Sequence, residues 1–135
     1  MIQLPTAGLL HIKERKLLLA FSRNKQCFYL PGGKVDKDET SAHALCREIK
    51  EELNVSVIAD QLVYYTHISA PAYGEVNGTI MEQDCYFATI ENIPEPSAEI
   101  DKICYFSLAD YRNELNQAPG AVMILEKLKE DGYID

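Results

Sequence analysis

Apolar and polar positions in the N-terminal part of the chain follow a pattern typical of strands. Two apolar runs, Thr6–Ile12 and Leu17–Phe21, flank the polar segment Lys13–Lys16, which predicts a hairpin. A shorter apolar run, Cys27–Leu30, predicts a strand that enters a turn at Pro31, Gly32 and Gly33. This part of the chain is therefore expected to be β-structure.

The period of the pattern changes to that of a helix after Thr40. Apolar side chains recur at spacings of three and four residues and form one stripe, made of Ala42, Leu45, Cys46, Ile49 and Leu53. Thr40 or Ser41 is suited to the N-cap position, because a hydroxyl can accept from a free backbone N–H of the first turn. The pattern predicts one helix whose stripe faces the core.

The remaining sequence predicts further strands and a second helix. Strands are expected at Val55–Ile58, Leu62–Ile68, Thr79–Ile90 and Lys102–Phe106, with Ala70–Gly78 as a loop. A helix is expected over Pro119–Glu130, where Ala121, Leu125 and Leu128 form an apolar side and proline suits the first turn. This order of elements predicts an α/β fold with a sheet sandwiched by helices.

Size and charge limit the classes of partner. A chain of 135 residues is long enough for one domain, which we expect over residues 1–135. Its 21 Asp and Glu exceed its 13 Lys and Arg, and no basic cluster is present. Because affinity for nucleic-acid phosphates depends on Lys and Arg, long nucleic acids are not expected as partners. A small polyphosphate is compatible if Mg²⁺ offsets the charge.

The N-terminus and the cysteines indicate a cytoplasmic protein. No basic segment precedes a long apolar run, and no stretch reaches the roughly 18 apolar residues that a membrane span needs. The four cysteines, Cys27, Cys46, Cys85 and Cys104, are widely spaced and form no C-x-x-C pair. We expect all four to be reduced thiols in the core rather than zinc ligands.

Three carboxylates converge on the predicted helix. Glu48, Glu51 and Glu52 lie within one and a half turns, so that their side chains share one small patch. Like charges at this distance repel each other and raise each other's pKa values. The arrangement predicts a site for a hard divalent cation, although a solvated polar helix face is the simpler alternative.

The spacing around these carboxylates matches a longer signature. Counting from Gly33, five residues lead to Glu39, seven more separate it from Arg47, and Glu48, Ile49, Glu51, Glu52 and Val55 follow in order. The sequence here resembles the Nudix hydrolases, whose signature is Gly, five residues, Glu, seven residues, Arg, Glu, an aliphatic, any residue, Glu, Glu, any residue, Gly and an aliphatic. Asn54 stands where the family has its second glycine. Asn is the next most tolerant residue at a left-handed helix end, so the motif is chemically complete.

The resemblance implies the mixed-sheet α/β/α Nudix fold over essentially the whole chain. It also implies attack by water on a phosphorus of a nucleoside diphosphate that is linked to another group. We expect Glu48 and Glu52 to bind the metal and Glu51 to act as a further ligand or as the base that activates water. Mg²⁺ is the expected cofactor, with Mn²⁺ as a substitute.

Other motif residues are expected to build the site. In the family, the glycine equivalent to Gly32 offers its carbonyl to the metal, and Gly33 allows close approach of the backbone. Arg47 is expected to pair with Glu39 in a bidentate contact that holds the loop against the helix. The alternative is a plain surface ion pair.

Residues outside the motif are weaker candidates. Many Nudix enzymes have a further glutamate near the position of Glu99, as a ligand or a base. Phe28, Tyr73 and Tyr86 are candidates for stacking on a nucleobase, with ordinary packing as the alternative for each. His43 lies off the apolar stripe and is expected to face solvent.

The predicted function is Mg²⁺-dependent hydrolysis of a nucleoside triphosphate to a monophosphate and pyrophosphate. Pro71 and Tyr73 lie near positions typical of ADP-ribose pyrophosphatases and dinucleoside polyphosphate hydrolases, and both remain alternatives. A non-hydrolytic nucleotide sensor is disfavoured because every carboxylate of the motif is present, and an RNA-end pyrophosphohydrolase because no basic surface is expected. A homodimer is left open.

Overall fold

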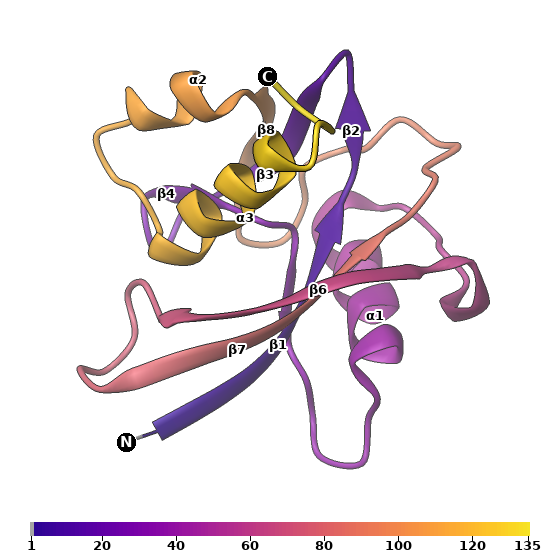
Figure 1. Ribbon diagram of the computed structural model, residues 1–135. Coiled ribbons are helices and arrows are strands. Elements are labelled where there is room, and N and C mark those ends of the chain that lie inside the picture. The colour runs from indigo at the N-terminus through magenta and orange to yellow at the C-terminus, as the bar shows by residue number, and fades with distance from the viewer. Residues whose placement is uncertain (1) are drawn as a thin grey trace.

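The computed structural model describes residues 2–135, which form two β-sheets with helices on both sides (Figure 1). The first sheet has the strand order β5-β1-β7-β6, formed by Gly32–Lys34, Ile2–Leu10, Thr79–Phe87 and Val63–Pro71. β1 and β7 are parallel and the other two pairs are antiparallel, so the sheet is mixed. In the second sheet, β3 (Lys16–Ser22) pairs with β2 (Ile12–Lys13), β4 (Cys27–Tyr29) and β8 (Ile100–Phe106).

The helices lie in two layers. α1 (Ser41–Leu53) covers one side of the strands, while α2 (Leu108–Arg112) and α3 (Pro119–Glu130) cover the other (Figure 1). A single 3₁₀ turn, η1 (Ala59–Gln61), precedes β6. This arrangement confirms the expected α/β/α fold with a mixed sheet.

The central strands β1 and β3 contribute side chains to both layers. On β1, Ala7 and Leu9 pack with Leu45 of α1, whereas Leu10 belongs to the cluster that includes Leu125 of α3. The side chains of β3 alternate in the same way. Strands that are covered on both faces have continuous apolar sequences, which explains the uninterrupted apolar run in β3.

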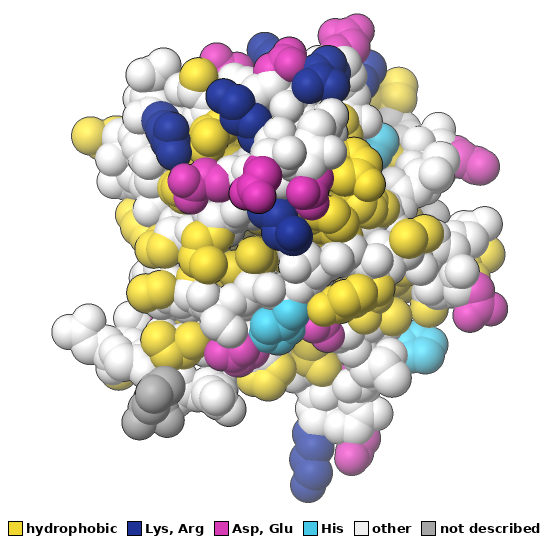
Figure 2. Space-filling model, viewed as in Figure 1, with side chains coloured by type: hydrophobic (Ala, Val, Ile, Leu, Met, Phe, Trp, Pro, Cys, Tyr) yellow, Lys and Arg dark blue, Asp and Glu magenta, His cyan; other side chains and the backbone are white. Residues whose placement is uncertain are grey.

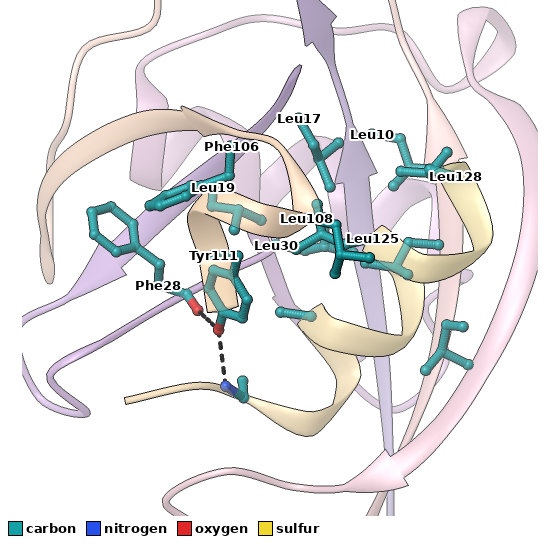
Figure 3. Close-up of a cluster of buried hydrophobic side chains, with 14 of the residues drawn as sticks. Leu10, Leu17, Leu19, Phe28, Leu30, Phe106, Leu108, Tyr111, Leu125 and Leu128 are labelled. Carbon is teal, nitrogen blue, oxygen red and sulfur yellow. Dashed lines mark hydrogen bonds between the residues drawn. The ribbon is translucent and has the colours of Figure 1, made fainter. Parts of the chain in front are cut away.

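The larger hydrophobic cluster, on the α3 side, contains a buried tyrosine (Figure 3). The hydroxyl of Tyr111 donates to the carbonyl of Phe28 over 2.6 Å and accepts from the N–H of Ala118 over 2.9 Å. Burying a hydroxyl is tolerated when it is hydrogen-bonded in this way. Tyr111 thereby links α2 to β4 and to the start of α3.

The caps of α1 agree with the sequence predictions. The side chain of Thr40 accepts from the N–H of His43, so Thr40 is the N-cap. Asn54 ends the helix in the left-handed region, at φ 55° and ψ 37°, and its N–H donates to the carbonyl of Lys50. The predicted extent of α3, Pro119–Glu130, is also confirmed.

Several predictions of strand structure were wrong. The predicted hairpin at Lys13–Lys16 is present but short, since only β2 turns back on β3, while most of the first apolar run forms β1, which pairs with β7 and β5. Val55–Ile58 is not a strand, since the segment packs beside α1 instead of joining a sheet. Gly32 and Gly33, expected in a turn with Pro31, lie in the strand β5, and the short helix α2 was not predicted.

The cysteines differ in burial more than was predicted. Cys27 and Cys85 are buried, Cys46 is half-buried and Cys104 is exposed. Cys104 was therefore wrongly assigned to the core, because its side chain on β8 is exposed although its partner across the sheet, Leu19, is buried. None of the helices in residues 2–135 is long and apolar enough to cross a membrane.

Candidate active site

A guanidinium clamp holds the loop before α1 against the helix. Arg47 donates through Nε to Glu39 Oε2 over 3.0 Å and through Nη2 to Glu39 Oε1 over 2.9 Å. The same carboxylate accepts from the N–H of Asp36. These hydrogen bonds, that from Arg47 first, lower the pKa of Glu39 to about 2. The predicted bidentate pair is confirmed.

The guanidinium of Arg47 also contacts Glu48 and the backbone of β5. Its Nη1 donates to Glu48 Oε1 over 2.9 Å, while Nη2 also donates to the carbonyl of Lys34 on β5. One side chain thus connects the loop, the helix and the edge strand, and it fixes the rotamer of Glu48.

Two glycines of β5 let α1 approach the sheet. A Cβ on Gly33 would lie 2.6 Å from the carboxyl carbon of Glu48, so a larger residue would displace that carboxylate. Gly32 has a φ of +139°, a conformation that side-chain-bearing residues rarely adopt, and its N–H donates to Glu52 Oε1 over 3.0 Å. Both glutamates are therefore held against glycine backbone.

Glu52 is buried, with 3% of its surface exposed, and forms no ion pair with a side chain of residues 2–135. Burial raises its pKa to about 9, and the charges of Glu48 and Glu99 act in the same direction. Burial also raises the pKa of Glu48. Desolvation and mutual repulsion therefore disfavour the ionised form of both carboxylates, and only Glu48 has a guanidinium beside it.

The loop before β8 brings Glu99 to the same place. The N–H of Ser97 donates to the carbonyl of Glu52 over 2.8 Å, and its hydroxyl donates to the carbonyl of Glu51. These contacts fix the loop to the end of α1. Glu99 then lies within reach of the charges of Glu48 and Glu52, as their pKa values indicate.

The carboxylates open into one cavity of about 380 Å³. Glu48, Glu52 and Glu99 line it together with Gly32 and Gly33. Its other walls come from β1, β4, β7, the loop after β6 and the start of α3, and include Thr6, Lys25, Tyr29, Lys34, Tyr73, Glu75, Met81 and Gln83. We call this cavity the active-site pocket.

The family of the protein follows from comparison with known proteins. A family model described as the NUDIX domain matches residues 3–128. The chain belongs to the Nudix family. It is accordingly a Nudix pyrophosphohydrolase that acts on nucleoside diphosphate derivatives, and residues 33–55 are its Nudix box. A comparison with individual curated proteins gives no match.

Solved structures share the Nudix fold. A MutT NUDIX hydrolase from Burkholderia pseudomallei is 22% identical, with a TM-score of 0.78 over 95% of this chain and 99% of its own. The E. coli ORF135 protein is 23% identical, with a TM-score of 0.74 over 100% and 96%. A bifunctional NMN adenylyltransferase/ADP ribose pyrophosphatase from Francisella tularensis, complexed with AMP and Mn, is 23% identical, with a TM-score of 0.68 over 96% and 42%. At these identities the likeness establishes the fold.

The donors of the Nudix box fit a divalent cation. All of them are oxygen atoms, which suit a hard ion such as Mg²⁺, and a cation would offset the desolvation and repulsion that raise the pKa values of Glu48 and Glu52. Among residues 2–135, no three His, Cys, Asp or Glu side chains are already gathered as a metal site. Glu48 instead faces Arg47 and Glu52 faces Gly32. Nudix hydrolases generally need a divalent metal, which would draw these carboxylates together.

Some predicted site residues lie elsewhere. Phe28 is buried in the core against Phe21 and Phe106, and it does not line the pocket, so the prediction of base stacking was wrong for it. Tyr86 was also wrongly assigned, because it lies on the α1 side, where its hydroxyl contacts that of Ser41. Tyr73 does line the pocket.

Other side chains of the Nudix box lie outside the active-site pocket. The side chain of Glu51 is 56% exposed and 3.9 Å from Arg47, outside the lining of the pocket. His43 is exposed, as predicted, and contacts Thr40. Sequence reasoning missed Tyr29, Lys25, Thr6 and Gln83, which belong to strands and turns without a motif.

Proposed function

We propose that this Nudix protein is a Mg²⁺-dependent enzyme that cleaves a nucleoside triphosphate to a monophosphate and pyrophosphate. The observation that carries this proposal is the joining of carboxylates, lysines and aromatic side chains in one pocket of about 380 Å³. Ligand pockets span roughly 300–1,000 Å³, so this one suits a mononucleotide better than two linked nucleosides.

In this proposal Glu48 and Glu52 hold the cation, with the carbonyl oxygen of Gly32 as a further ligand. When bound, Mg²⁺ neutralises phosphoryl oxygens and lowers the pKa of water. Arg47 keeps Glu48 oriented, as its 2.9 Å hydrogen bond indicates. Glu99, which lines the pocket, is the better candidate for the base that accepts the proton of the attacking water, and the exposed Glu51 is the alternative.

Two lysines supply positive charge for the phosphates. Lys25 and Lys34 both line the pocket and both contact Glu75, at 3.0 Å and 3.7 Å. A polyphosphate carries more charge than one carboxylate and can replace Glu75 as the partner of these lysines. Tyr29 and Tyr73 provide aromatic faces in the same pocket.

A small nucleotide in the cytoplasm is the proposed partner, rather than a long nucleic acid. The formal net charge of −8 supports this choice. On the face shown in Figure 2, acidic and basic side chains are intermixed, without a basic stripe for a phosphate backbone.

The test is a substrate screen. Purified protein with Mg²⁺ is offered canonical and oxidised nucleoside triphosphates, ADP-ribose and dinucleoside polyphosphates, and the products are separated by chromatography. We expect a monophosphate and pyrophosphate from a triphosphate with the highest kcat/KM. If ADP-ribose or a dinucleoside polyphosphate is cleaved with a much higher kcat/KM than every triphosphate, the proposed substrate class is wrong.

ADP-ribose is the second candidate. Pro71, near a position typical of ADP-ribose pyrophosphatases, lines the pocket, and the Francisella tularensis neighbour is described as a bifunctional NMN adenylyltransferase/ADP ribose pyrophosphatase. Tyr73, which also lines the pocket, keeps dinucleoside polyphosphates in the screen.

A further inference from the structure

Two polar side chains on neighbouring strands form the floor of the active-site pocket. Thr6 of β1 and Gln83 of β7 are directly paired across the sheet. Each residue is only 7% exposed, and both line the pocket. We call these two residues the polar floor.

The side chains of the polar floor are poorly paired with the rest of residues 2–135. Among residues 2–135, Thr6 Oγ1 is buried without any hydrogen bond. Gln83 Oε1 has one long contact, 3.9 Å from the thiol of Cys85, and its amide nitrogen donates to no acceptor in the described residues. Among these residues Thr6 Oγ1 is the one buried polar side-chain atom without a hydrogen bond, and burying a hydroxyl unpaired destabilises the fold, whereas the Gln83 amide faces the pocket. A ligand that supplies the missing partners accounts for both groups.

Gly8 fixes the position of the Gln83 amide. A Cβ on Gly8 would lie 3.0 Å from both Cδ and Nε2 of Gln83, and 2.7 Å from Cδ1 of Leu30. The amide therefore lies against the bare backbone of β1 beside Leu30. This packing restricts the rotamers of Gln83 before a ligand arrives, which lowers the entropy cost of binding.

The surroundings of the polar floor define the chemistry of its ligand. Leu4, Leu30, Met81 and Ala121 line the same pocket, so the floor is polar and the walls beside it are apolar. A planar, uncharged heterocycle with apolar faces and a polar edge fits this environment. The amide offers one donor and one acceptor, which match an edge with a neighbouring acceptor and donor.

We propose that Thr6 and Gln83 bind the edge of the substrate's nucleobase and determine which base is accepted. The inference rests on the active site of the proposed function, but not on which bond is cleaved. It assigns base selection to β1 and β7, away from the carboxylates of the Nudix box.

The test measures binding without turnover. Affinities for AMP, GMP, CMP and UMP are determined by calorimetry, with ribose 5-phosphate as a probe that has the sugar and phosphate but no base. The variants are Thr6→Val and Gln83→Leu, which remove the polar groups, with Thr6→Ser and Gln83→Glu as matched controls of shape.

We expect the wild type to bind one of the four monophosphates most tightly. Thr6→Val and Gln83→Leu should each weaken binding of that monophosphate about tenfold, the size of one good base contact. Binding of ribose 5-phosphate should stay within twofold of the wild type. Thr6→Ser should bind as the wild type does. Gln83→Glu should change the order of the four bases, because a carboxylate accepts but does not donate.

Thermal melting separates a binding role from a structural one. Because Thr6 Oγ1 has no partner in the protein, Thr6→Val should melt at the same temperature as the wild type or higher. The proposal is overturned if the affinities for all four monophosphates and for ribose 5-phosphate fall by the same factor, or if none of these affinities changes by twofold. If the variants change the base preference but the wild type cleaves no triphosphate, the proposed function is wrong and the role of Thr6 and Gln83 in base binding stands.

Discussion

Glu52 is buried beside glycine backbone, whereas the other glutamates of the Nudix box are half-buried or exposed. We expect Glu52→Gln to lower kcat about a thousandfold or more, because the amide keeps the volume but cannot supply a charged ligand. Its melting temperature should not fall, since the side-chain oxygen can still accept from the N–H of Gly32.

Steady-state kinetics at saturating Mg²⁺ check this, with the exposed Glu91→Gln as a control for loss of one carboxylate. A Glu52→Gln variant that retains more than about a tenth of the activity, an effect below 1.4 kcal/mol, would contradict the role as a metal ligand.

His67 on β6 gives a prediction about pH. It lies between Asp84 and Glu82, 2.8 Å from each, and hydrogen bonds to these carboxylates raise its pKa above 6.5. Protonation therefore stabilises the fold below pH 6.5, and this contribution is lost as pH rises through the folded pKa. We expect His67→Gln to be less stable than the wild type at pH 5.5 and equal to it at high pH.

The side chain of His67 is 41% exposed, so the difference should be below about 1 kcal/mol and smaller in high salt. Urea unfolding at several pH values measures it. An NMR titration of His67 with a pKa below 6.5 would contradict the explanation.

At the residue scale, sequence reasoning found the side chains that belong to a local motif and missed those that depend on the face of a strand. Phe28 was predicted for the pocket, but its neighbour Tyr29 lines the pocket, because successive side chains of β4 point to opposite faces. Thr6 and Gln83 become neighbours through pairing between β1 and β7, which no short-range pattern encodes.

Among the elements, the end of α1 gives a direct test of backbone conformation. Asn54 has a φ of 55°, so we expect Asn54→Gly to melt as the wild type or slightly higher and Asn54→Val to lose about 1–2 kcal/mol. Thermal melts of the three proteins compare these stabilities. If the valine variant has the same melting temperature as the wild type, the left-handed conformation does not explain why Asn54 can replace the glycine of the Nudix signature.

Helices could be predicted more fully than strands. The hydroxyl at Thr40, the apolar stripe and the proline at 119 act within a few residues of each other, so the limits of α1 and α3 were predicted well. Pairing of strands depends on distant segments. The apolar segment Val55–Ile58 was expected to pair, but Val55 packs in the α1-side cluster without entering a sheet.

For the whole molecule, the proposed dependence on a cation predicts the effect of a chelator. Excess EDTA should abolish hydrolysis, and added Mg²⁺ or Mn²⁺ should restore it, because the buried carboxylates need positive charge. Initial rates before and after dialysis measure this. Full activity in EDTA would contradict the proposed cofactor.

The alternation along β1 has a consequence for how such an enzyme can diversify. Ala7 and Leu9 pack with α1, which carries the carboxylates of the Nudix box, while Thr6 faces the pocket. Because adjacent positions of one strand serve opposite faces, a substitution at position 6 leaves the packing under the Nudix box intact. Relatives could therefore acquire new substrates by changes on one face of β1 and β7, while the other face preserves the reaction.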